Sequence, residues 1–508
     1  MKLERLIKSI YEEDLPPLPE HLAGQQVTGI HYRSDQVTAG GLFVAIEGFA
    51  ADGHDYAADA AARGAVAVVC QKALDVDVPA IRVANSRRAL ARLAAAFYGH
   101  PSRKMTLVAI TGTNGKTTTS FLAESILAAA GFRVGVIGTI NYRFGGRTWD
   151  NPVTTPESAD LQQILARMQQ AGVTHVVMEV SSHGLDLYRV HGCDIDLAVF
   201  TNLSQDHLDY HKTMEAYWES KRRLFTDYLI PSADKLGPRA VINIDDQHGR
   251  WLAQSLAVPK LTFSLQDPAA KVWVKDADLS ASGIRAEILS PAGIINVKSP
   301  LVGTHNLENL ACAVGIGCAL DLTREQMVSG ITSLQTVPGR LEAVANRKRR
   351  HVFVDYAHSP DALANALTAL RNLGNGRLIC VFGCGGDRDA DKRPRMGRIA
   401  GQGADLVVVT SDNPRSEDPL AIIDQIIAGM DMECRRSRPA DEADAGQCRC
   451  FVEPDRRRAI ELAIRLSRPG DTILIAGKGH ETYQITGNTR TAFDDRVEAA
   501  RALELLER

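Results

Sequence analysis

The stretch that decides the fold is Thr111-Gly112-Thr113-Asn114-Gly115-Lys116-Thr117-Thr118-Thr119. It follows an apolar run at 107–110 and precedes a helix-like segment at 118–130. A strand, a glycine-rich turn, Lys-Thr and a helix describe a phosphate-binding loop, where backbone N–H groups and the positive end of the helix dipole hold phosphate oxygens. Lys116 would place its charge on the β- and γ-phosphates, and the Thr117 hydroxyl would bind Mg²⁺. The stretch therefore predicts nucleotide binding, although the general motif has glycine where this chain has Ile110.

The chain around this loop is expected to form three α/β domains, because 508 residues are too many for one hydrophobic core. Residues 1–103 predict a small α/β domain, with an N-terminal helix that Pro16-Pro17 would stop. Residues 104–337 predict a doubly wound P-loop ATPase sheet, with edge strands added at 260–302. Residues 338–508 repeat the alternation of strand and helix and predict a Rossmann-like α/β domain.

The expected elements follow from apolar runs and helical periodicity. Thr155 is expected to cap a helix whose first residue is Pro156. The expected strands lie at 41–46, 66–70, 81–83, 107–110, 133–138, 175–180, 197–200, 241–244, 352–354, 378–381, 406–409 and 473–476, and the main helices at 56–63, 87–98, 118–130, 156–170 and 214–228.

Composition excludes several classes of function. The net charge of −3 gives no electrostatic case for a nucleic-acid partner. The sequence has no apolar run of membrane-spanning length and no signal-peptide core near its start, so we expect a cytoplasmic protein without membrane insertion. The nine cysteines are expected to be buried or idle thiols rather than a metal clip. The polar segment 434–450 is expected to be a surface insertion.

Three further residues of the second domain need interpretation, and two of them have two interpretations each. Glu179 ends an expected strand, where a carboxylate would bind Mg²⁺ or would only cap a helix. His207 follows another strand and would serve as a ligand or a structural histidine. Spacing alone places Lys221 on a solvated basic helix face. In the third domain, polar clusters follow four strands, at the ends where α/β folds place ligands, and they lie at 355–358, 383–389, 411–415 and 477–481.

Four motifs, taken together and in order, resemble those of the Mur ligase family. They are Gly112-Thr113-Asn114-Gly115-Lys116-Thr117-Thr118, Glu179-Val180-Ser181-Ser182-His183-Gly184, Asn202-Leu203 with Asp206-His207-Leu208-Asp209, and Asp412-Asn413-Pro414-Arg415. The resemblance implies an ATP- and Mg²⁺-dependent ligase that adds meso-2,6-diaminopimelate to UDP-N-acetylmuramoyl-L-alanyl-D-glutamate in peptidoglycan precursor synthesis. It also implies a monomer whose partners are these small molecules.

The resemblance further implies a role for individual residues. The catalytic group would be Lys116, Glu179, His207 and Lys221, and the metal ligands Thr117, Glu179, His207 and a carbamylated Lys221. ATP would contact Gly112, Thr113, Asn114, Gly115, Lys116, Thr117, Thr118, Asn306, Asn309, Arg340 and Asp355. The UDP-linked substrate would contact Ser34, Phe49, Ala50, Ala51, Thr154, Thr155, Ser181 and Arg189. The amino acid would contact Arg388, Asp412, Asn413, Pro414, Arg415, Gly477 and Glu481.

The chain departs from the family pattern at two positions. It reads Arg33-Ser34-Asp35 where relatives commonly read Asp-Ser-Arg, and it has Leu187 where some members have glutamine. Both departures concern contacts with the UDP-linked substrate and leave the class of enzyme unchanged.

Diaminopimelate differs from lysine by one remote carboxylate, which the guanidinium of Arg415 would pair bidentately, while Asp412 accepts from the neighbouring ammonium. A buried Arg415 left unpaired by lysine would give selectivity on the order of 10²–10⁴. The rival hypotheses are an L-lysine-adding Mur ligase, a folylpolyglutamate-synthase-like ligase, a P-loop motor or switch that hydrolyses ATP without an amine, and a nucleotide-binding scaffold.

Overall fold

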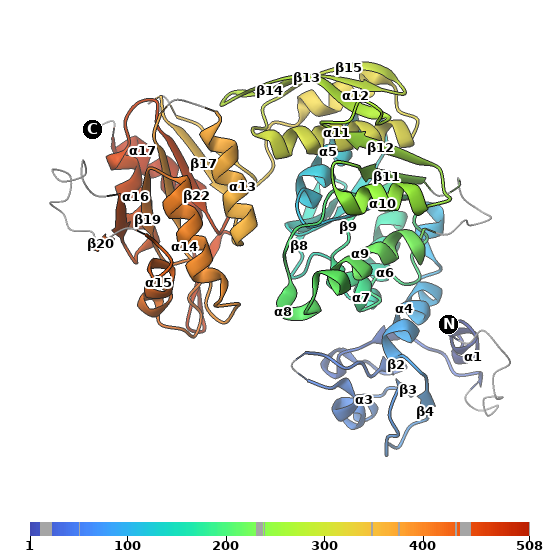
Figure 1. Ribbon diagram of the computed structural model, residues 1–508. Helices are drawn as coiled ribbons and strands as arrows, with labels where there is room; N and C mark the ends of the chain where they lie inside the picture. Colours follow the sequence, from blue (N-terminus) through green and yellow to red (C-terminus); the bar gives the residue numbers. More distant parts are fainter. Residues whose placement is uncertain are drawn as a thin grey trace.

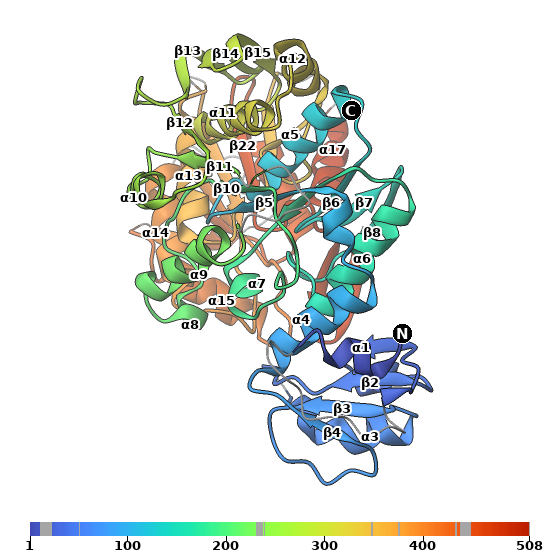
Figure 2. The same ribbon diagram turned by 90° about the vertical axis from the view of Figure 1, so that its right-hand side faces the viewer.

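The computed structural model describes residues 1–10, 23–49, 51–229, 237, 239–346, 349–373, 376–431, 434–436 and 449–506. It has three α/β bodies, each built on its own sheet (Figure 1). The first body lies beneath the second, with helix α4 (Ser86–Phe97) beside α6 (Ser158–Gln170) at their junction in both views (Figures 1 and 2). The third, orange to red, lies beside the second in Figure 1. The expected α/β class is confirmed.

The first sheet has four parallel strands in the order β1-β2-β3-β4. The two central strands are buried along their whole length, so apolar side chains fill both faces. The elements are β1 (Gly29–His31), β2 (Gly41–Val44), β3 (Ala67–Cys70), β4 (Ala80–Arg82), α1 (Leu3–Ile7), α3 (Ala57–Ala62), α4, and the 3₁₀ turns η1 (Ser34–Gln36), η2 (Gly53–Tyr56) and η3 (Pro101–Lys104).

The second sheet has eleven strands in the order β15-β14-β13-β12-β11-β10-β5-β9-β6-β7-β8. The strands from β13 to β6 are parallel, and antiparallel strands extend both edges. Its strands are β5 (Thr106–Thr111), β6 (Val134–Ile137), β7 (Asn141–Phe144), β8 (Arg147–Asp150), β9 (His175–Glu179), β10 (Leu197–Phe200), β11 (Arg239–Asn243), β12 (Lys260–Ser264), β13 (Val272–Ser280), β14 (Gly283–Ser290) and β15 (Gly293–Ser299).

Helices cover both faces of this sheet, as predicted for a doubly wound fold. Leu122, Leu310 and Met327 bring α5, α11 and α12 into one buried cluster, whereas Leu161 and Leu224 bring α6 and α9 into another. The helices are α5 (Lys116–Ala129), α6, α7 (Ser182–Asp186), α8 (Leu208–His211), α9 (Met214–Thr226), α10 (Gln247–Ser255), α11 (Thr304–Ala319) and α12 (Arg324–Ser333).

The third sheet has the order β16-β17-β22-β18-β19-β21-β20, and all its strands except β16 are parallel. A separate hairpin, β23-β24, follows β22. The elements are β16 (Glu342–Val344), β17 (His351–Asp355), β18 (Leu378–Phe382), β19 (Leu406–Val409), β20 (Arg435–Arg436), β21 (Cys450–Val452), β22 (Thr472–Ala476), β23 (Tyr483–Thr486), β24 (Thr489–Ala492), α13 (Pro360–Arg371), α14 (Lys392–Gly403), α15 (Pro419–Ile427), α16 (Arg456–Leu466) and α17 (Asp495–Leu505).

Two local expectations are wrong. Helix α6 begins at Ser158, and its cap is Glu157, whose carboxylate accepts from the Ser158 N–H at 3.1 Å. Thr155 instead donates to the Glu179 carbonyl at 3.1 Å, because tertiary packing against β9 takes its hydroxyl. Cys434 and Cys450 form a disulfide and are not idle thiols.

Two segments named in the sequence analysis fall wholly or partly outside the described residues. They are Pro16-Pro17 and most of the 434–450 insertion, of which only its two ends are described. In the described part of the chain, no helix has the length and apolar character needed to cross a bilayer.

Candidate active site

The phosphate loop lies at the carboxyl end of β5, in the middle of the second sheet. Gly112 and Gly115 have φ angles of +147° and +86°. A Cβ on Gly112 would lie 1.9 Å from Thr201 Oγ1, and one on Gly115 would lie 2.5 Å from Asn309 Oδ1. Glycine is therefore required at both positions by conformation and by space.

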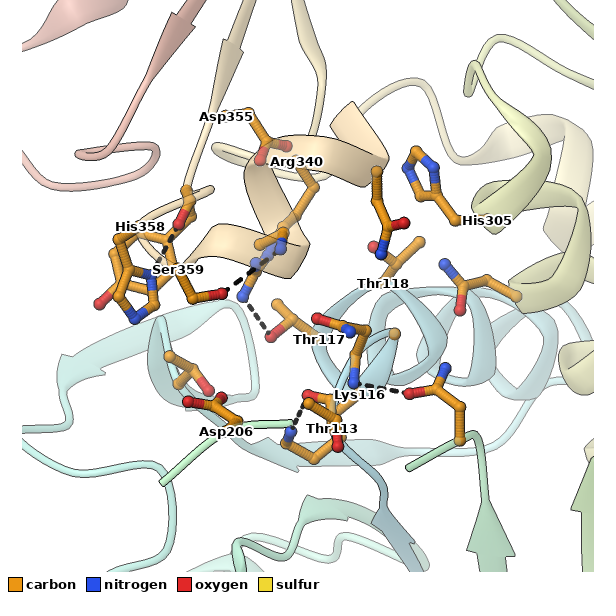
Figure 3. Close-up of a pocket in the computed structure, with 18 of the residues that line it drawn as sticks. Thr113, Lys116, Thr117, Thr118, Asp206, His305, Arg340, Asp355, His358 and Ser359 are labelled. Atoms are coloured by element: carbon orange, nitrogen blue, oxygen red, sulfur yellow. Dashed lines mark hydrogen bonds between the residues drawn. The ribbon is translucent and has the colours of Figure 1, made fainter. Parts of the chain in front are cut away.

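A cavity of about 280 Å³ opens beside this loop. Its wall includes Thr113 to Thr118 on one side and residues of the third body on the other (Figure 3). Arg340 reaches across and donates to Thr117 Oγ1 at 3.1 Å. Of the residues predicted for ATP, the metal and the substrate, those that line the cavity are Thr113, Asn114, Gly115, Lys116, Thr117, Thr118, Thr154, Ser181, His207, Lys221, Asn309, Arg340 and Asp355.

Two lysines converge on the loop. Lys116 Nζ donates to the carbonyls of Gly112 and Thr113, each at 2.8 Å, and Lys221 Nζ donates to the Gly112 carbonyl at 2.7 Å. Burial lowers the pKa of both amines; the charge of Lys116 lowers that of Lys221 further, and the charge of Arg340 lowers that of Lys116. Pairs of this kind are typical of functional sites.

The prediction of a solvated face at Lys221 is wrong, since only 1% of this residue is exposed. Its Nζ lies 4.5 Å from the centroid of the Tyr217 ring, one helical turn earlier on α9. The Tyr217 hydroxyl lies 3.2 Å from Thr113 Oγ1, so this buried face of α9 packs on the phosphate loop. Sequence spacing could not show which face of α9 turns inward.

Glu179 is buried at the end of β9 and is 1% exposed. Its carboxylate accepts from the hydroxyls of Thr117 at 3.0 Å and Thr139 at 2.8 Å, and from the Thr139 N–H at 3.1 Å. It does not cap α7, whose cap is Ser181, so the helix-cap interpretation is wrong. A Cβ on Gly138 would lie 2.3 Å from Glu179 Oε1, which shows how closely the backbone encloses this carboxylate.

The oxygens of Thr117 and Glu179 fit a magnesium ion. Mg²⁺ prefers hard oxygen ligands and usually takes only one or two from the protein, with waters and phosphates completing the octahedron. His207 stands at φ +54° and lines the same cavity. Burial lowers its pKa to about 4, so its imidazole is neutral at pH 7.

The nucleotide side of the cavity differs in detail from the prediction. Asn309 lines the wall, but Asn306 is 1% exposed and lies behind it, donating to the Val302 carbonyl at 2.8 Å. Asp355 accepts from the N–H groups of Leu341 and Ala357, and its burial raises its pKa. The cavity is also lined by Asp206, from the third family motif, and by Tyr356 and His358, from the polar cluster at 355–358, although none of these had a predicted role. Ser359, His305 and Glu308 line it too, and for the last two the signal was that they share one face of α11 with Asn309.

Residues predicted for the UDP-linked substrate fall into two groups. Thr154, Thr155, Ser181 and Arg189 lie together at the end of β9, where Arg189 donates to the Thr155 carbonyl at 3.0 Å. In the first body, Ser34 begins η1, and Phe49 is 75% exposed, with its ring edge-on to Tyr210 of α8 at 5.7 Å. Ala51, two residues after Phe49, is exposed, and Ala50 lies outside the described residues.

An ion pair that the sequence did not indicate joins these two bodies. Glu157 pairs with Arg87 of α4 at 2.9 Å and with Arg189 at 3.4 Å. Two guanidinium groups against one carboxylate leave an excess positive charge, which suits an anionic substrate. Arg33, by contrast, pairs with Asp35 at 2.8 Å on the exposed surface.

The residues predicted for the amino acid form a separate cluster and do not line the cavity of about 280 Å³. Asp412 and Asn413 follow β19, and Glu481 follows β22. Asn413 Nδ2 donates to Glu481 Oε2 at 2.9 Å, which joins the two loops. Arg415 is half-buried, with φ +52° and an Nη1 that donates to the Gly386 carbonyl at 2.7 Å. The selectivity expected from the sequence depends on a pocket that buries Arg415, whereas the arginine is only partly buried in this structure.

The remaining predicted members of this cluster lie around it. Pro414 is buried between Asn413 and Arg415, and Arg388 is exposed on the neighbouring loop. Gly477 has φ +117°, and a Cβ there would lie 3.2 Å from Asp412 Oδ2. The residue at the centre is Lys478, which is 0% exposed; it belongs to the polar cluster at 477–481 but was not among the predicted contacts of the amino acid.

Comparison with known proteins agrees with this arrangement. Three family models match consecutive parts of the chain: the Mur ligase family catalytic domain at 26–98, the Mur ligase middle domain at 110–317, and the Mur ligase glutamate ligase domain at 339–479. The UDP-N-acetylmuramoyl-L-alanyl-D-glutamate–2,6-diaminopimelate ligase of Geobacter metallireducens is 48% identical over 487 residues, which cover 95% of each chain. The enzyme of the same name from Bacillus velezensis is 43% identical over 503 residues, which cover 99% of each chain.

A solved structure of an enzyme of that name is similar over 100% of both chains, with a TM-score of 0.70 and 33% identity. The family models, the full-length relatives and the full-length structural match thus agree on one family. The chain belongs to the Mur ligase family.

Proposed function

We propose that this chain is an ATP-dependent ligase that joins meso-2,6-diaminopimelate to the D-glutamate of UDP-N-acetylmuramoyl-L-alanyl-D-glutamate in peptidoglycan precursor synthesis. The observation that carries the proposal is the combination of a phosphate loop with Asp412-Asn413-Pro414-Arg415 in one chain. Full-length relatives named for this activity, at 43% and 48% identity, support it.

The proposed reaction has two steps. The D-glutamate carboxylate attacks the γ-phosphorus of ATP and releases ADP, which leaves an acyl phosphate. The amine of diaminopimelate then attacks the acyl carbon and expels phosphate through a tetrahedral intermediate. Lys116 and the loop N–H groups offset the repulsion between the carboxylate and the triphosphate, and positioning supplies much of the rate.

Mg²⁺ would be held by Thr117 and Glu179, and it would neutralise charge on the phosphates. Neutral His207 has a lone pair available for a second ion. Lys221 is proposed as the carbamylated lysine of the family, which would turn its amine into a further oxygen ligand. Its lowered pKa favours the neutral amine that reacts with CO₂. Lys221→Ala with full activity would remove this assignment.

Each body has a proposed task. Residues 1–103 bind the UDP-linked substrate, 104–337 bind ATP, and 338–508 bind the amino acid. The excess positive charge of Arg87 and Arg189 over Glu157, at the first junction, supports the first of these. We further propose a monomer that acts in the cytoplasm on these small molecules.

A direct assay tests the proposal. Phosphate release is measured with ATP, Mg²⁺, the UDP-linked dipeptide and either meso-diaminopimelate or L-lysine, and the product is identified by mass. We expect kcat/KM for diaminopimelate to exceed that for lysine by about 10²-fold, because lysine leaves Arg415 without its carboxylate. Equal efficiency with lysine would support the lysine-adding rival, and phosphate release without any amine would support the motor.

An arginine variant with a matched control tests whether Arg415 discriminates diaminopimelate from lysine. Arg415→Gln should bring the two kcat/KM values to within about tenfold of each other, since a neutral amide discriminates weakly. Arg490→Gln, an exposed arginine of β24 in the adjacent hairpin, should keep the wild-type ratio. Unchanged selectivity in Arg415→Gln would assign the discrimination to another group.

A further inference from the structure

Lys478 is a fully buried lysine at the centre of the amino-acid cluster. It follows β22 and has 0% exposure. Its Nζ donates to Asn413 Oδ1 at 3.0 Å and to Glu481 Oε2 at 3.1 Å, and it lies 3.5 Å from Asp412 Oδ1. One ammonium thus joins side chains from two loops that are more than sixty residues apart in the sequence.

Further hydrogen bonds tie the members of the cluster to one another and to the hairpin. Asn413 Oδ1 also accepts from the Ile485 N–H at 2.9 Å, and its Nδ2 donates to Glu481 Oε2. The Asp412 carbonyl accepts from Gln484 at 2.7 Å. These bonds fix the loops after β19 and β22 and the first strand of the hairpin as one unit.

Charge decides what this unit binds. Two carboxylates, Asp412 and Glu481, face one ammonium, so the cluster retains one negative charge. Arg456, a further cation that interacts with both carboxylates, is paired with Asp495 at 2.7 Å, and both side chains are 0% exposed, so the pair adds no net charge. Arg415 supplies positive charge at the other side of Asn413. A zwitterion with one ammonium and one carboxylate at this end complements that pattern.

We propose that Lys478 is a positioning residue for the amino-acid substrate: it aligns Asp412, Asn413 and Glu481 and sets their net charge to the single negative charge that one substrate ammonium requires. This inference rests on the proposed function and adds a residue to it. Lys478 acts through the two carboxylates and does not contact the reacting atoms.

The test asks whether Lys478→Met raises or lowers KM for diaminopimelate, first in the wild-type enzyme and then in the Glu481→Gln variant. In the wild-type background, Lys478→Met leaves two unpaired negative charges, and we expect KM for diaminopimelate to rise at least about tenfold. Glu481→Gln leaves no net charge and should also raise this KM. The double variant Lys478→Met/Glu481→Gln again carries one negative charge, so its KM should lie below that of Glu481→Gln. The KM values for ATP and the UDP-linked substrate should stay within about twofold.

A purely structural lysine would raise KM for diaminopimelate in both backgrounds, and that result would overturn the inference. If Lys478→Met does not fold, the comparison of Glu481→Gln with the double variant still decides the sign. Arg490→Met is the control, because Arg490 lies 3.7 Å from the Tyr483 ring centroid, near Lys478, and forms no ion pair with Asp412 or Glu481. A wild-type enzyme inactive with diaminopimelate would instead refute the proposed function, so the two failures are distinct.

Discussion

At the scale of the residue, Glu179 shows how a backbone position can control a buried carboxylate. Its two oxygens accept three hydrogen bonds, and Gly138 leaves room for them only because it lacks a Cβ. The burial of this acid is tolerated because its lone pairs are satisfied. The carboxylate is held in one place before any metal arrives, which favours a fixed coordination geometry.

We therefore predict that Gly138→Ala lowers kcat about 10- to 100-fold at saturating substrates, because a Cβ 2.3 Å from Glu179 Oε1 displaces the carboxylate from Thr117. The rate at increasing Mg²⁺ concentration is the measurement, and a higher Mg²⁺ requirement is expected. Gly24→Ala is the control, since nothing lies within 4 Å of its added Cβ. Wild-type kinetics in Gly138→Ala would show that Glu179 has no role at the metal.

At the scale of the element, a buried ion pair holds helices α16 and α17 beneath the amino-acid loops. Arg456 makes two 2.7 Å bonds to Asp495 and also donates to the Ala476 carbonyl at the end of β22. The pair thus ties two helices to the strand that leads into Lys478. Removal of one partner leaves an uncompensated buried charge, which is more costly than removal of both.

Arg456→Met should accordingly lower the free energy of unfolding of the third body by about 3–5 kcal/mol. Replacement of both partners, Arg456→Met with Asp495→Leu, should recover most of that loss. Urea unfolding followed by circular dichroism measures both. The neighbouring Arg457→Met should change stability by less than about 1 kcal/mol, because the Arg457 side chain is 46% exposed. Equal losses in Arg456→Met and Arg457→Met would contradict this account.

At the scale of the whole molecule, individual side chains reach from one body to the next, in addition to the packing of α4 beside α6. Arg340 of the third body donates to Thr117 of the second, and Phe49 of the first contacts Tyr210 of the second. The nucleotide cavity has walls from two bodies, so its geometry depends on how they meet (Figure 3). If ATP binds in this cavity as proposed, its binding and the arrangement of these bodies are linked.

For this contact we predict that Arg340→Ala raises KM for ATP about 10- to 100-fold, since a cation facing the phosphates is lost. The unfolding midpoint should stay unchanged, because the arginine lies at a junction and not in a core. Initial rates and binding of a fluorescent ATP analogue measure the effect. Arg371→Ala, an exposed arginine of the third body paired with Asp405, is the control. An unaltered KM for ATP would place Arg340 outside the nucleotide site.

Much of the fold was predictable because its signals are local. The phosphate loop, the buried strands β5, β18, β19 and β22, and the polar clusters that follow them are continuous in the sequence. Short or exposed elements, such as β1 and the hairpin β23-β24, lack such a signal. The roles predicted for individual residues came from the family motifs, and they remain proposals.

The sequence by itself determined the phosphate loop, the alternation of strands and helices, and the membership of the Mur ligase family. Only the tertiary structure decided that Lys221 is buried and that Lys478 joins two distant loops. It also decided that the Thr155 hydroxyl donates to the Glu179 carbonyl and does not cap a helix. The physical reason is that periodicity defines a face of an element but not what packs against it. Burial and charge balance arise from contacts between segments far apart in the chain, and these exist only once the bodies have folded.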